Sequence, residues 1–494
     1  MTHANNKVSR RHFLERGATA VGGVAAVGGW PLRGFAAGKP SPNNQLRIGV
    51  IGLNGRGKAH LESFSKVDGA QVVALSDCDL DILGKAADSF EREHERKVET
   101  FQDYRRLLER DDIDAISIAT PNHWHALMAI DAIQAGKHVY VEKPVCHTLW
   151  EGRQLVKAAR KQDRLVAAGF QNRSDVGLDA AFAWLREGHL GEMKMARGLC
   201  YRNRASIGRR DTALTPPASV DYDLCLGPAA DLPMFRPQFH YDWHWIWNTG
   251  NGDMGNQGPH EMDVLRWALG DPGHPQSVMS FGGRFGWNDA SETPNTQFAS
   301  FDFGTGVPVV FEVRDMRLTP TSKERASFKG RSGGVILTYE GGEFRGGRGG
   351  GSIYVDGVET KKFKGDKGVT HFANFCEAVR NNDLSSLRSP VESAYYSSSL
   401  SHLANLSLAT GGAVSAASLS ENLASDALAT EAAGRMSEHL QAWDVDLEKT
   451  PWTLGSSLDF DPEAERFVGG DQRQVANKFL HREDRPKWTV PEIA

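Results

Sequence analysis

Short apolar runs alternate with amphipathic segments between about residues 45 and 170. Buried parallel strands are typically short and almost continuously apolar, whereas the helices that connect them show a helical period. This alternation predicts a parallel sheet with helices on both faces. Strands are expected at Leu46–Ile51, Gln71–Ser76, Ala115–Ala119, His138–Val141 and Leu165–Gly169, and helices from about Lys58 and at Leu80–His94, Arg105–Arg110, Trp124–Ala135 and Glu151–Lys161.

After residue 170 the apolar segments become longer and are separated by turns, which favours a mostly antiparallel sheet. The glycine-rich segment Gly341–Gly351 is predicted to be a flexible hairpin connection, because no helix start follows it as a phosphate loop would require. Strands are expected at Met193–Tyr201, Ser277–Phe285, Thr296–Phe303, Val307–Arg314, Ala326–Gly330 and Gly334–Tyr339, and helices at Gly177–Glu187, Pro259–Ala268, His371–Arg380 and Ser393–Thr410.

The first 40 residues differ in composition from the rest. The sequence Ser9-Arg-Arg-His-Phe-Leu14 is a twin-arginine pattern, and a weakly hydrophobic run at Gly17–Gly29 follows it. This arrangement predicts a Tat export signal and therefore a periplasmic or otherwise exported protein, tethered if the signal is not cleaved. The alternative is an unstructured basic N-terminus.

Composition and charge narrow the class of protein. The formal net charge is −5, with 40% hydrophobic and 24% charged residues, which is ordinary for a globular protein and argues against a nucleic-acid partner. After residue 40 no run is long and apolar enough for a membrane span, so no integral membrane domain is expected. The five cysteines are scattered without a CxxC pair and indicate buried free thiols rather than a disulfide framework or a zinc site.

A glycine-rich turn follows the first predicted strand. In a GxGxxG frame, glycines would stand at 52, 54 and 57; Gly52 and Gly57 fit, whereas Asn54 takes the middle place beside Gly55. Such a turn lets a pyrophosphate approach backbone N–H groups at a helix N-terminus. Asp77 ends the second strand, where a carboxylate binds the ribose hydroxyls and repels a 2′-phosphate, so NAD is favoured over NADP. The alternative role for Asp77 is a helix N-cap.

Together these motifs resemble the Gfo/Idh/MocA family of NAD(P)-dependent sugar oxidoreductases, in its Tat-exported branch. The resemblance covers roughly residues 45–410 and implies α/β architecture: an N-terminal Rossmann doubly wound parallel sheet plus a C-terminal α+β domain with a large, mostly antiparallel open sheet. The expected boundaries are 1–40 for the signal and linker, 41–170 for the NAD domain, 171–410 for the substrate and oligomerisation domain, and 411–494 for an extension wrapping the surface. The matching pieces are Ile48–Gly57, Ala119–His125, Ala135–Val139, Glu142–Pro144, Gln171–Arg173, Gly250–Asp263 and His371–Val379.

The resemblance also implies which residues hold the cofactor. His125 would lie near the nicotinamide, although it could instead cap the helix that follows it. A homo-oligomer, either a dimer or a tetramer, is implied by the open sheet. The implied cofactor-binding residues are Gly52, Asn54, Gly55, Arg56, Gly57, Asp77, Thr120, Pro121, Asn122, His125, Glu142, Lys143 and Gln171.

Three residues are candidates for the chemistry. In the family, the lysine of the Glu-Lys-Pro motif contacts the substrate hydroxyl near the nicotinamide, and here it is Lys143. An ammonium beside a positively charged ring loses its proton more readily. The family also has an acid four residues before a histidine; here the histidine is His260 and Asn256 replaces the acid. His260 can act as acid or base, whereas Asn256 can only hydrogen-bond sugar hydroxyls. A lysine that merely solvates a strand end is the alternative for Lys143.

The aromatic segment His240–Trp247 suits a sugar-binding platform, because aromatic rings stack on pyranose faces. Two alternatives are aromatic packing and a metal site, since His240, Asp242 and His244 would share one face of a strand. No metal is expected, because no further ligand is evident. Surface solvation is the alternative for Arg173. The expected substrate-binding residues are His147, Arg173, His240, Trp243, His244 and Asn256.

The expected function is hydride transfer between a tightly bound NAD and a carbohydrate hydroxyl or ketone. A second hypothesis is a glycoside-cleaving or glycoside-modifying enzyme that uses bound NAD for transient oxidation, as some relatives do. A third is a non-catalytic sugar-binding relative. The complete Glu142-Lys143-Pro144 motif argues against the third hypothesis, and Asn256 argues mildly for it.

Overall fold

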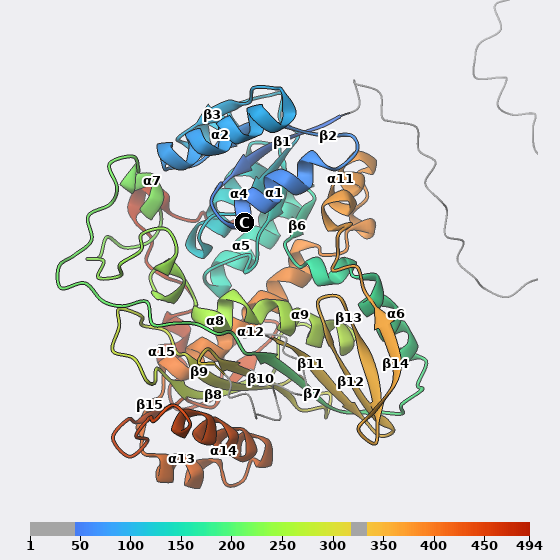
Figure 1. Ribbon diagram of the computed structural model, residues 1–494, viewed down its shortest axis with the longest axis vertical. Helices are drawn as coiled ribbons and strands as arrows, with labels where there is room; N and C mark the ends of the chain where they lie inside the picture. The colour runs from blue at the N-terminus through green and yellow to red at the C-terminus, as the bar shows by residue number, and fades with distance from the viewer. Residues whose placement is uncertain (1–44, 318–332) are drawn as a thin grey trace, which may run out of the picture. The chain divides into compact units, whose positions relative to one another are not determined.

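The computed structural model describes residues 45–317 and 333–494 (Figure 1). The chain divides into two compact units, Met1–Pro40 and Ser41–Ala494, and all described residues belong to the second. The twin-arginine pattern and the strand expected at Ala326–Gly330 therefore lie outside the described residues. None of the described helices combines the length and the apolar character needed to cross a membrane.

The N-terminal part of the described chain is a six-stranded sheet with the order β3-β2-β1-β4-β5-β6 and parallel pairing throughout. This order is the one found in doubly wound dinucleotide-binding folds, and it confirms the predicted fold class. The strands are β1 (Leu46–Ile51), β2 (Ala70–Ser76), β3 (Glu99–Phe101), β4 (Ala115–Ile118), β5 (His138–Val141) and β6 (Val166–Ala168), and the helices are α1 (Arg56–Ser65), α2 (Leu80–His94), α3 (Tyr104–Leu108), α4 (His125–Gln134) and α5 (Leu149–Lys161).

Both faces of this sheet are buried, as the continuous apolar runs require. Ile48 and Val50 of β1 pack in one hydrophobic cluster with residues of α1, α2 and α11 (His371–Asn381). Ile51 and Ile116 pack in the other cluster, with residues of α3, α4 and α5. The carboxyl ends of β1 and β4, where the strand order reverses, therefore form a crevice between two helical layers.

The C-terminal part contains a mixed sheet of 12 strands, and its main path runs β14-β13-β12-β11-β7-β10-β9-β8-β16-β15. Pairing along this path is antiparallel except between β7 and β10. The strands are β7 (Met193–Cys200), β8 (Ser277–Gly283), β9 (Thr296–Asp302), β10 (Val309–Arg314), β11 (Gly333–Tyr339), β12 (Gly342–Gly347), β13 (Gly350–Val355), β14 (Val358–Lys364), β15 (Gly412–Val414), β16 (Trp452–Leu454), β17 (Leu458–Asp461) and β18 (Arg466–Phe467).

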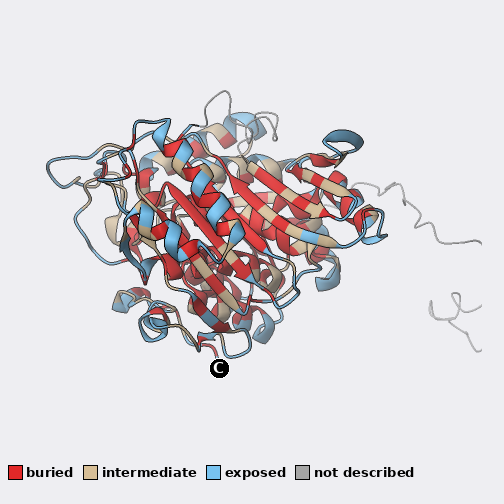
Figure 2. Ribbon diagram, turned by 90° about the horizontal axis from the view of Figure 1, so that it is seen from below, coloured by how far each residue is buried: buried red, intermediate tan, exposed pale blue. Residues whose placement is uncertain are grey.

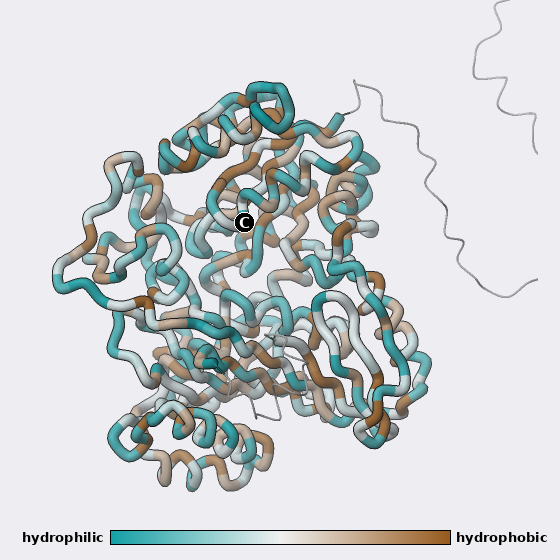
Figure 3. The backbone as a smooth tube through the Cα atoms, viewed as in Figure 1, coloured by the Kyte–Doolittle hydropathy of each residue, from teal (hydrophilic) through white to brown (hydrophobic). Residues whose placement is uncertain are grey.

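The two faces of this sheet pack against different helices. Ala299 and Phe311 point into a cluster with α9 and α12, whereas the neighbouring Phe298 and Val310 point into a cluster with α13 and α14. Most strand residues are consequently buried (Figure 2), and α13 and α14 alternate hydrophilic and hydrophobic positions (Figure 3). The helices of this part are α6 (Val176–Arg186), α7 (Tyr222–Leu226), α8 (Gly252–Asn256), α9 (Gly258–Ala268), α12 (Val391–Ala409), α13 (Ala416–Leu423), α14 (Ala427–Gln441) and α15 (Arg473–Lys478).

Two segments differ from the expectation. The glycine-rich segment is not a flexible connection but forms β12 and the start of β13, where a Cβ at Gly346 or Gly351 would lie 2.3 Å from the Phe344 ring. The segment around His244 is a 3-10 turn at Asp242–Trp245 rather than a strand. Tertiary packing, which local propensity does not report, decides both cases.

The C-terminal extension adds strands to the large sheet and packs into the hydrophobic core beside the nucleotide-binding sheet. Strands β15, β16 and β17 extend the large sheet. Trp488, Val490 and Ile493 are buried in the same cluster as the helices of the nucleotide-binding sheet. The end of the described chain thus completes the core of its first domain.

Candidate active site

A cavity of about 570 Å³ lies at the carboxyl ends of β1, β2, β4 and β5. We call the loops after these strands, residues 51–57, 76–78, 119–125 and 142–143, the floor. We call residues 201–249, between β7 and α8, the roof; its regular elements are α7 and the 3-10 turn at Asp242–Trp245. Residues 222–249 of the roof include many of the cavity-lining side chains.

The glycine turn of the floor allows a ligand to approach its backbone closely. Gly52 has φ +81° and its N–H donates to the Ser76 carbonyl at 2.9 Å. A Cβ on Gly57 would lie 1.8 Å from the Gly52 carbonyl oxygen, whereas a Cβ on Gly55, which has φ +49°, would meet nothing within 4 Å. The open space beside Gly55 lies at the start of α1, where backbone N–H groups favour an anion. The residues present therefore fit a dinucleotide pyrophosphate.

Asp77 stands at the end of β2 and lines the cavity. Its carboxylate accepts the N–H groups of Leu53 at 2.8 Å and Asp79 at 3.0 Å. The N-cap of α2 is Asp79, whose side chain accepts from the Asp81 N–H, so the capping role does not fall to Asp77. Burial raises the pKa of Asp77, and the two N–H donors oppose this change. Its remaining lone pairs can accept hydrogen bonds from ribose hydroxyls.

Glu142, at the end of β5, is a buried carboxylate with several donors. Its Oε1 accepts from Arg56 Nε at 2.6 Å, His60 Nε2 at 3.0 Å and Gln171 Nε2 at 3.3 Å. Burial alone would raise the pKa of Glu142, but Arg56 and His60 hold it well below its usual range. Glu142 thus links α1 to the loop after β6 and keeps its negative charge beside Lys143.

Lys143 lines the cavity together with His260. Its Nζ donates to the main-chain oxygen of Asn256 at 2.8 Å, and no described carboxylate lies within 4.0 Å of it. Burial lowers the pKa of Lys143, while the charge of Glu142 opposes the change. Burial, and then the charge of Lys143, hold the pKa of His260 well below its usual range. Both groups are therefore easier to deprotonate than in water, as a proton acceptor must be.

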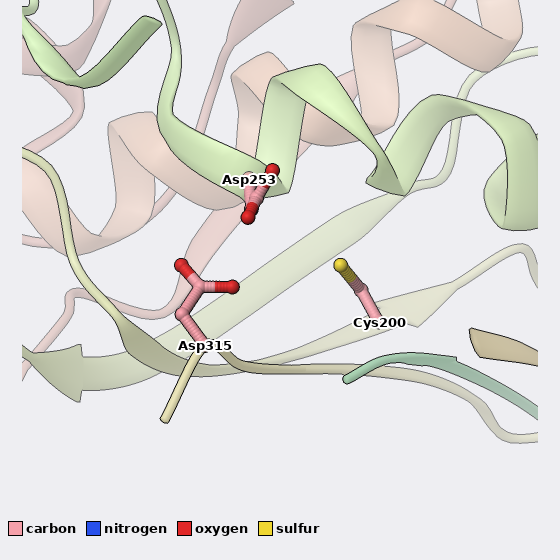
Figure 4. A group of neighbouring side chains, drawn as sticks. All are labelled: Cys200, Asp253 and Asp315. Atoms are coloured by element: carbon pink, nitrogen blue, oxygen red, sulfur yellow. The ribbon is translucent and has the colours of Figure 1, made fainter. Parts of the chain in front are cut away.

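Asn256 is fixed by the buried Asp253. Figure 4 shows Asp253 with the neighbouring side chains of Asp315 and Cys200. The Asn256 Nδ2 donates to Asp253 at 3.0 Å, and Arg204 binds both oxygens of Asp253 at 2.7 and 2.8 Å. Despite burial, Arg204 lowers the pKa of Asp253 to about 2, whereas burial and Asp253 raise the pKa of Asp315 well above its usual range. Ligand atoms of Cys200, Asp253 and Asp315 lie within 4.8 Å of one another, but Arg204 already occupies Asp253. The group therefore acts as an ionic support for α8.

The loops after β4 and β5 are joined by His125. Its ring nitrogens lie 2.6 Å from the Pro144 oxygen and 2.8 Å from the Thr120 oxygen. His125 begins α4 but makes no side-chain cap, so it does not take the alternative role of helix cap. Of the other implied cofactor residues, Gly57 alone is absent from the cavity lining. It packs closely against the Gly52 carbonyl instead. The lining includes Gly52, Asn54, Gly55, Arg56, Asp77, Thr120, Pro121, Asn122, His125, Glu142, Lys143 and Gln171.

Two of the expected substrate-binding residues are placed elsewhere. Arg173 binds both oxygens of Asp263 at 2.8 Å and both oxygens of Asp271 at 2.8 and 2.6 Å. It is 7% exposed and lines a separate cavity of about 520 Å³, so it is neither a residue of the active-site cavity nor a solvated surface residue. His147 is buried with Nε2 at 3.3 Å from the Gly250 oxygen, and it does not line the cavity. Both side chains are engaged in fixing the segments around α8 and α9.

The aromatic segment of the roof does line the cavity, at two different ends. His240 Nε2 lies 2.8 Å from Asp79, beside the ribose position. Trp243 stacks on His244 with ring centroids 3.6 Å apart. Burial lowers the pKa of His244 to about 4, and the charge of Lys143 contributes to this change. Trp243, His244, Asn256, His260 and Lys143 all line the cavity.

Arg236 and Arg348 are two of the lining arginines that have no counterpart in the sequence analysis. Arg236 of the roof is 7% exposed, and its Nε has no hydrogen-bond partner among the described residues. Its Nη2 donates to the Phe239 oxygen at 3.1 Å, and within the described chain no carboxylate lies within 4.0 Å of it. Arg348 lies at the turn between β12 and β13, and its charge helps to lower the pKa of His260. No periodicity or spacing marks either residue in advance.

Fold and floor together define an NAD-binding protein of the Rossmann type. The family profile described as "Oxidoreductase family, NAD-binding Rossmann fold" matches residues 46–170, and the profile described as "GFO/IDH/MocA C-terminal domain" matches residues 229–336. These two regions of the chain therefore match the N-terminal and C-terminal domains of the Gfo/Idh/MocA family.

Curated relatives match over part of their length. "Glycosyl hydrolase family 109 protein 1" of Shewanella sp. (strain ANA-3) is 36% identical over 176 residues, which are 32% of this chain and 38% of the relative. "Alpha-N-acetylgalactosaminidase" of Shewanella oneidensis is 35% identical over 176 residues, again 32% and 38%. The chain thus spans about two fifths of the relatives it matches.

Solved structures share the fold. The WlbA dehydrogenase of Bordetella pertussis, in complex with NADH and UDP-GlcNAcA, has a TM-score of 0.53 at 20% identity, covering 73% of this chain and 95% of that one. Levoglucosan dehydrogenase, in complex with NADH and levoglucosan, has a TM-score of 0.53 at 16% identity, covering 73% and 96%.

Proposed function

We propose that the protein is an NAD-dependent oxidoreductase that transfers a hydride between a tightly bound nicotinamide cofactor and a carbohydrate hydroxyl or ketone. The observation that carries this proposal is the position of Lys143, a half-buried amine that lacks a described carboxylate partner and lines one cavity with the glycine turn. The names of the curated relatives and the ligands of the solved neighbours support a sugar as the substrate class.

NAD, when bound, supplies the hydride acceptor. Burial lowers the pKa of Lys143. Its amine accepts the proton of the hydroxyl that is oxidised. His260 faces the same space and shares this proton. The Asn256 side chain, held by Asp253, orients a neighbouring hydroxyl, and the Trp243 ring offers an apolar face to the sugar. The roof excludes water from the reacting carbon.

Replacement of Lys143 tests the proposal. K143M should reduce turnover by about 10²- to 10⁴-fold, because it removes the proton acceptor. The dinucleotide content, measured after denaturing the protein, should stay unchanged. K58M is the matched control, since Lys58 lies exposed on α1. Turnover that survives in K143M would overturn the role of Lys143. The substrate is found by identifying the released dinucleotide and screening sugars for its reduction.

A second candidate is glycoside cleavage through transient oxidation at the same site. The glycosidase names of the curated relatives favour it, and so does the roof, because an enclosed cofactor suits a reaction that returns its hydride. Aryl glycosides in deuterated water separate the two functions. Transient oxidation predicts deuterium in the product without accumulation of NADH, whereas net oxidation predicts NADH without release of the aglycone.

The remaining expectations stand as parts of this proposal. The twin-arginine pattern supports export by the Tat pathway. If the signal is not cleaved, it would tether the exported protein. The four segments separated by the boundaries at residues 40, 170 and 410 are proposed to be functional units. A homo-oligomer, dimer or tetramer, would use the part of the large sheet that α13 and α14 leave open; light scattering would measure its size.

A further inference from the structure

Two cysteines meet where the floor and the roof touch. Cys78 directly follows Asp77 in the floor, and Cys225 lies on α7 in the roof. Both line the cavity and both are half-buried, whereas Cys146, Cys200 and Cys376 are buried.

Backbone pairing fixes the two segments against each other. The N–H of Asp221 donates to the Cys78 carbonyl at 2.9 Å, and the N–H of Leu80 donates to the Ser219 carbonyl at 2.9 Å. Between these bonds, Asp79 and Val220 form an antiparallel bridge. The loop after β2 and the strand-like stretch before α7 therefore form a short two-stranded ladder.

This ladder places Cys225 next to Cys78. Asp221 is the N-cap of α7, and the N–H of Cys225 donates to the Asp221 carbonyl at 2.9 Å, so Cys225 lies one helical turn from the residue that bonds Cys78. The pKa of the Cys78 thiol is raised well above its usual range, first by a hydrogen bond with the Cys225 thiol and then by burial. The ladder and this first turn of α7 thus bring the two thiols close to each other.

We propose that Cys78 and Cys225 form a disulfide under oxidising conditions, and that this disulfide fastens the roof to the ribose loop and retains the dinucleotide. Each thiol gives up its hydrogen and one sulfur–sulfur bond forms. The two protons and two electrons reduce an external disulfide, such as oxidised glutathione or a disulfide-forming oxidase, to two thiols. In a reducing compartment the pair stays open and the cofactor can enter.

The position of the bond explains why it would matter. Asp77 precedes Cys78 and faces the ribose site, and His240 of the roof reaches Asp79 just beyond it. A covalent link at this point joins the two layers beside the adenosine half of the cavity. Because a dinucleotide leaves only when the layers separate, a link between them slows release. The retention role rests on the dinucleotide site of the proposed function. The disulfide itself rests on the positions of the two cysteines.

Chemical mapping tests the bond itself. The dinucleotide-loaded protein is incubated with oxidised glutathione at alkaline pH, since the thiolate is the reacting form. Non-reducing peptide mass mapping should show a Cys78–Cys225 link, and thiol titration in denaturant should fall from the five free cysteines to three. The C225S variant should show no link. Five free thiols after oxidation, or a link to another cysteine, would overturn the proposal.

Dialysis tests the consequence. Loss of bound dinucleotide should be at least about tenfold slower in the oxidised wild type than in the reduced one. Dithiothreitol should restore fast release, and C225S should release at one rate under both conditions. Equal rates in oxidised and reduced wild type would reject the retention role. Neither readout depends on turnover, so failure of the Lys143 mechanism would leave this test intact.

Discussion

The floor and the roof of the cavity are built in opposite ways. The floor consists of the loops at the carboxyl ends of parallel strands, and each loop begins where a strand of the sheet ends. The roof spans residues 201–249 with α7 and one 3-10 turn as its regular elements, and it is held by a backbone bridge at Asp79 and Val220 and by the pair of His240 with Asp79. The parallel sheet thus supplies the glycine turn of the floor, whereas the long segment between β7 and α8 covers the cavity.

Buried charges in the two layers differ accordingly. In the floor, Glu142 receives Arg56 and His60, so its charge is compensated before any ligand binds. In the roof, the Arg236 guanidinium is buried without a carboxylate among the residues that the structure describes. Buried ions are normally paired, so Glu142 is compensated within the fold, whereas Arg236 is left to be compensated by a ligand beneath the roof.

The largest effect is expected in the glycine turn of the floor. G57A places a Cβ 1.8 Å from the Gly52 oxygen, so the turn and α1 must separate, and dinucleotide binding should be lost. G84A is the matched control: Gly84 is exposed on α2 outside the cavity lining, and its Cβ meets nothing within 4 Å. Isothermal titration with NAD measures both variants. Equal losses in the two would contradict the geometry.

The next effect distinguishes two buried glutamates by pH. Burial raises the pKa of Glu261, on α9, to about 8 from a usual 4.5. A raised pKa contributes stability below the usual value, and this contribution is lost as pH rises toward 8. E261Q should therefore match the wild type near pH 5 and exceed its free energy of unfolding by up to about 3 kcal/mol near pH 8.5.

The counterpart is Glu142, whose pKa lies well below its usual range. Its contribution is present above the usual value and is lost only as pH falls through the lower folded value. E142Q should therefore be destabilised at both pH 5 and pH 8.5. Urea unfolding at the two pH values measures each variant, and a pH-independent gain in E261Q would show that its carboxyl does not titrate as described.

A smaller effect is expected where the roof meets the floor. H240A removes the partner of Asp79 and should weaken dinucleotide affinity about tenfold, because one charge-assisted hydrogen bond across the two layers is lost. The KM for the sugar should change little. A rise in that KM with unchanged dinucleotide affinity would instead favour the predicted role of His240 in substrate binding.

The smallest effect is expected at Arg236. R236M should leave the stability of the dinucleotide-free protein unchanged or raise it by about 1 kcal/mol, because an uncompensated buried cation is removed. The increase in melting temperature on adding NAD should become smaller. R210M is the control, since Arg210 is an exposed roof residue outside the cavity lining. Parallel loss of stability with and without NAD would show that Arg236 serves packing alone.

The sequence predicted the floor well because its signals are local. The apolar run ending at Ile51 matches β1 at both ends, and the spacing from Gly57 to Asp77 follows from the length of one strand–helix–strand unit. Glu142 and Lys143 stand at a strand end and therefore face the crevice. Period and chain order are sufficient to place such residues.

The roof and the supporting ionic groups could not be predicted in this way. Arg173 carries the same local pattern whether it faces a sugar or, as found, binds Asp263 and Asp271. Arg236 and His240 lie in a segment without periodicity, and their partners come from distant parts of the chain. Side-chain direction in such loops depends on tertiary contacts, which a single sequence does not display.

Packing of the C-terminal residues has a consequence for synthesis on the ribosome. The Trp488 ring lies edge-on to Trp124 with centroids 5.2 Å apart, and the N–H of Ile493 donates to Gln154 at 2.7 Å. The nucleotide-binding domain is synthesised before these residues, so part of the apolar surface that they cover is exposed until they arrive. A chain cut before Trp488 should consequently leave that apolar surface in contact with water.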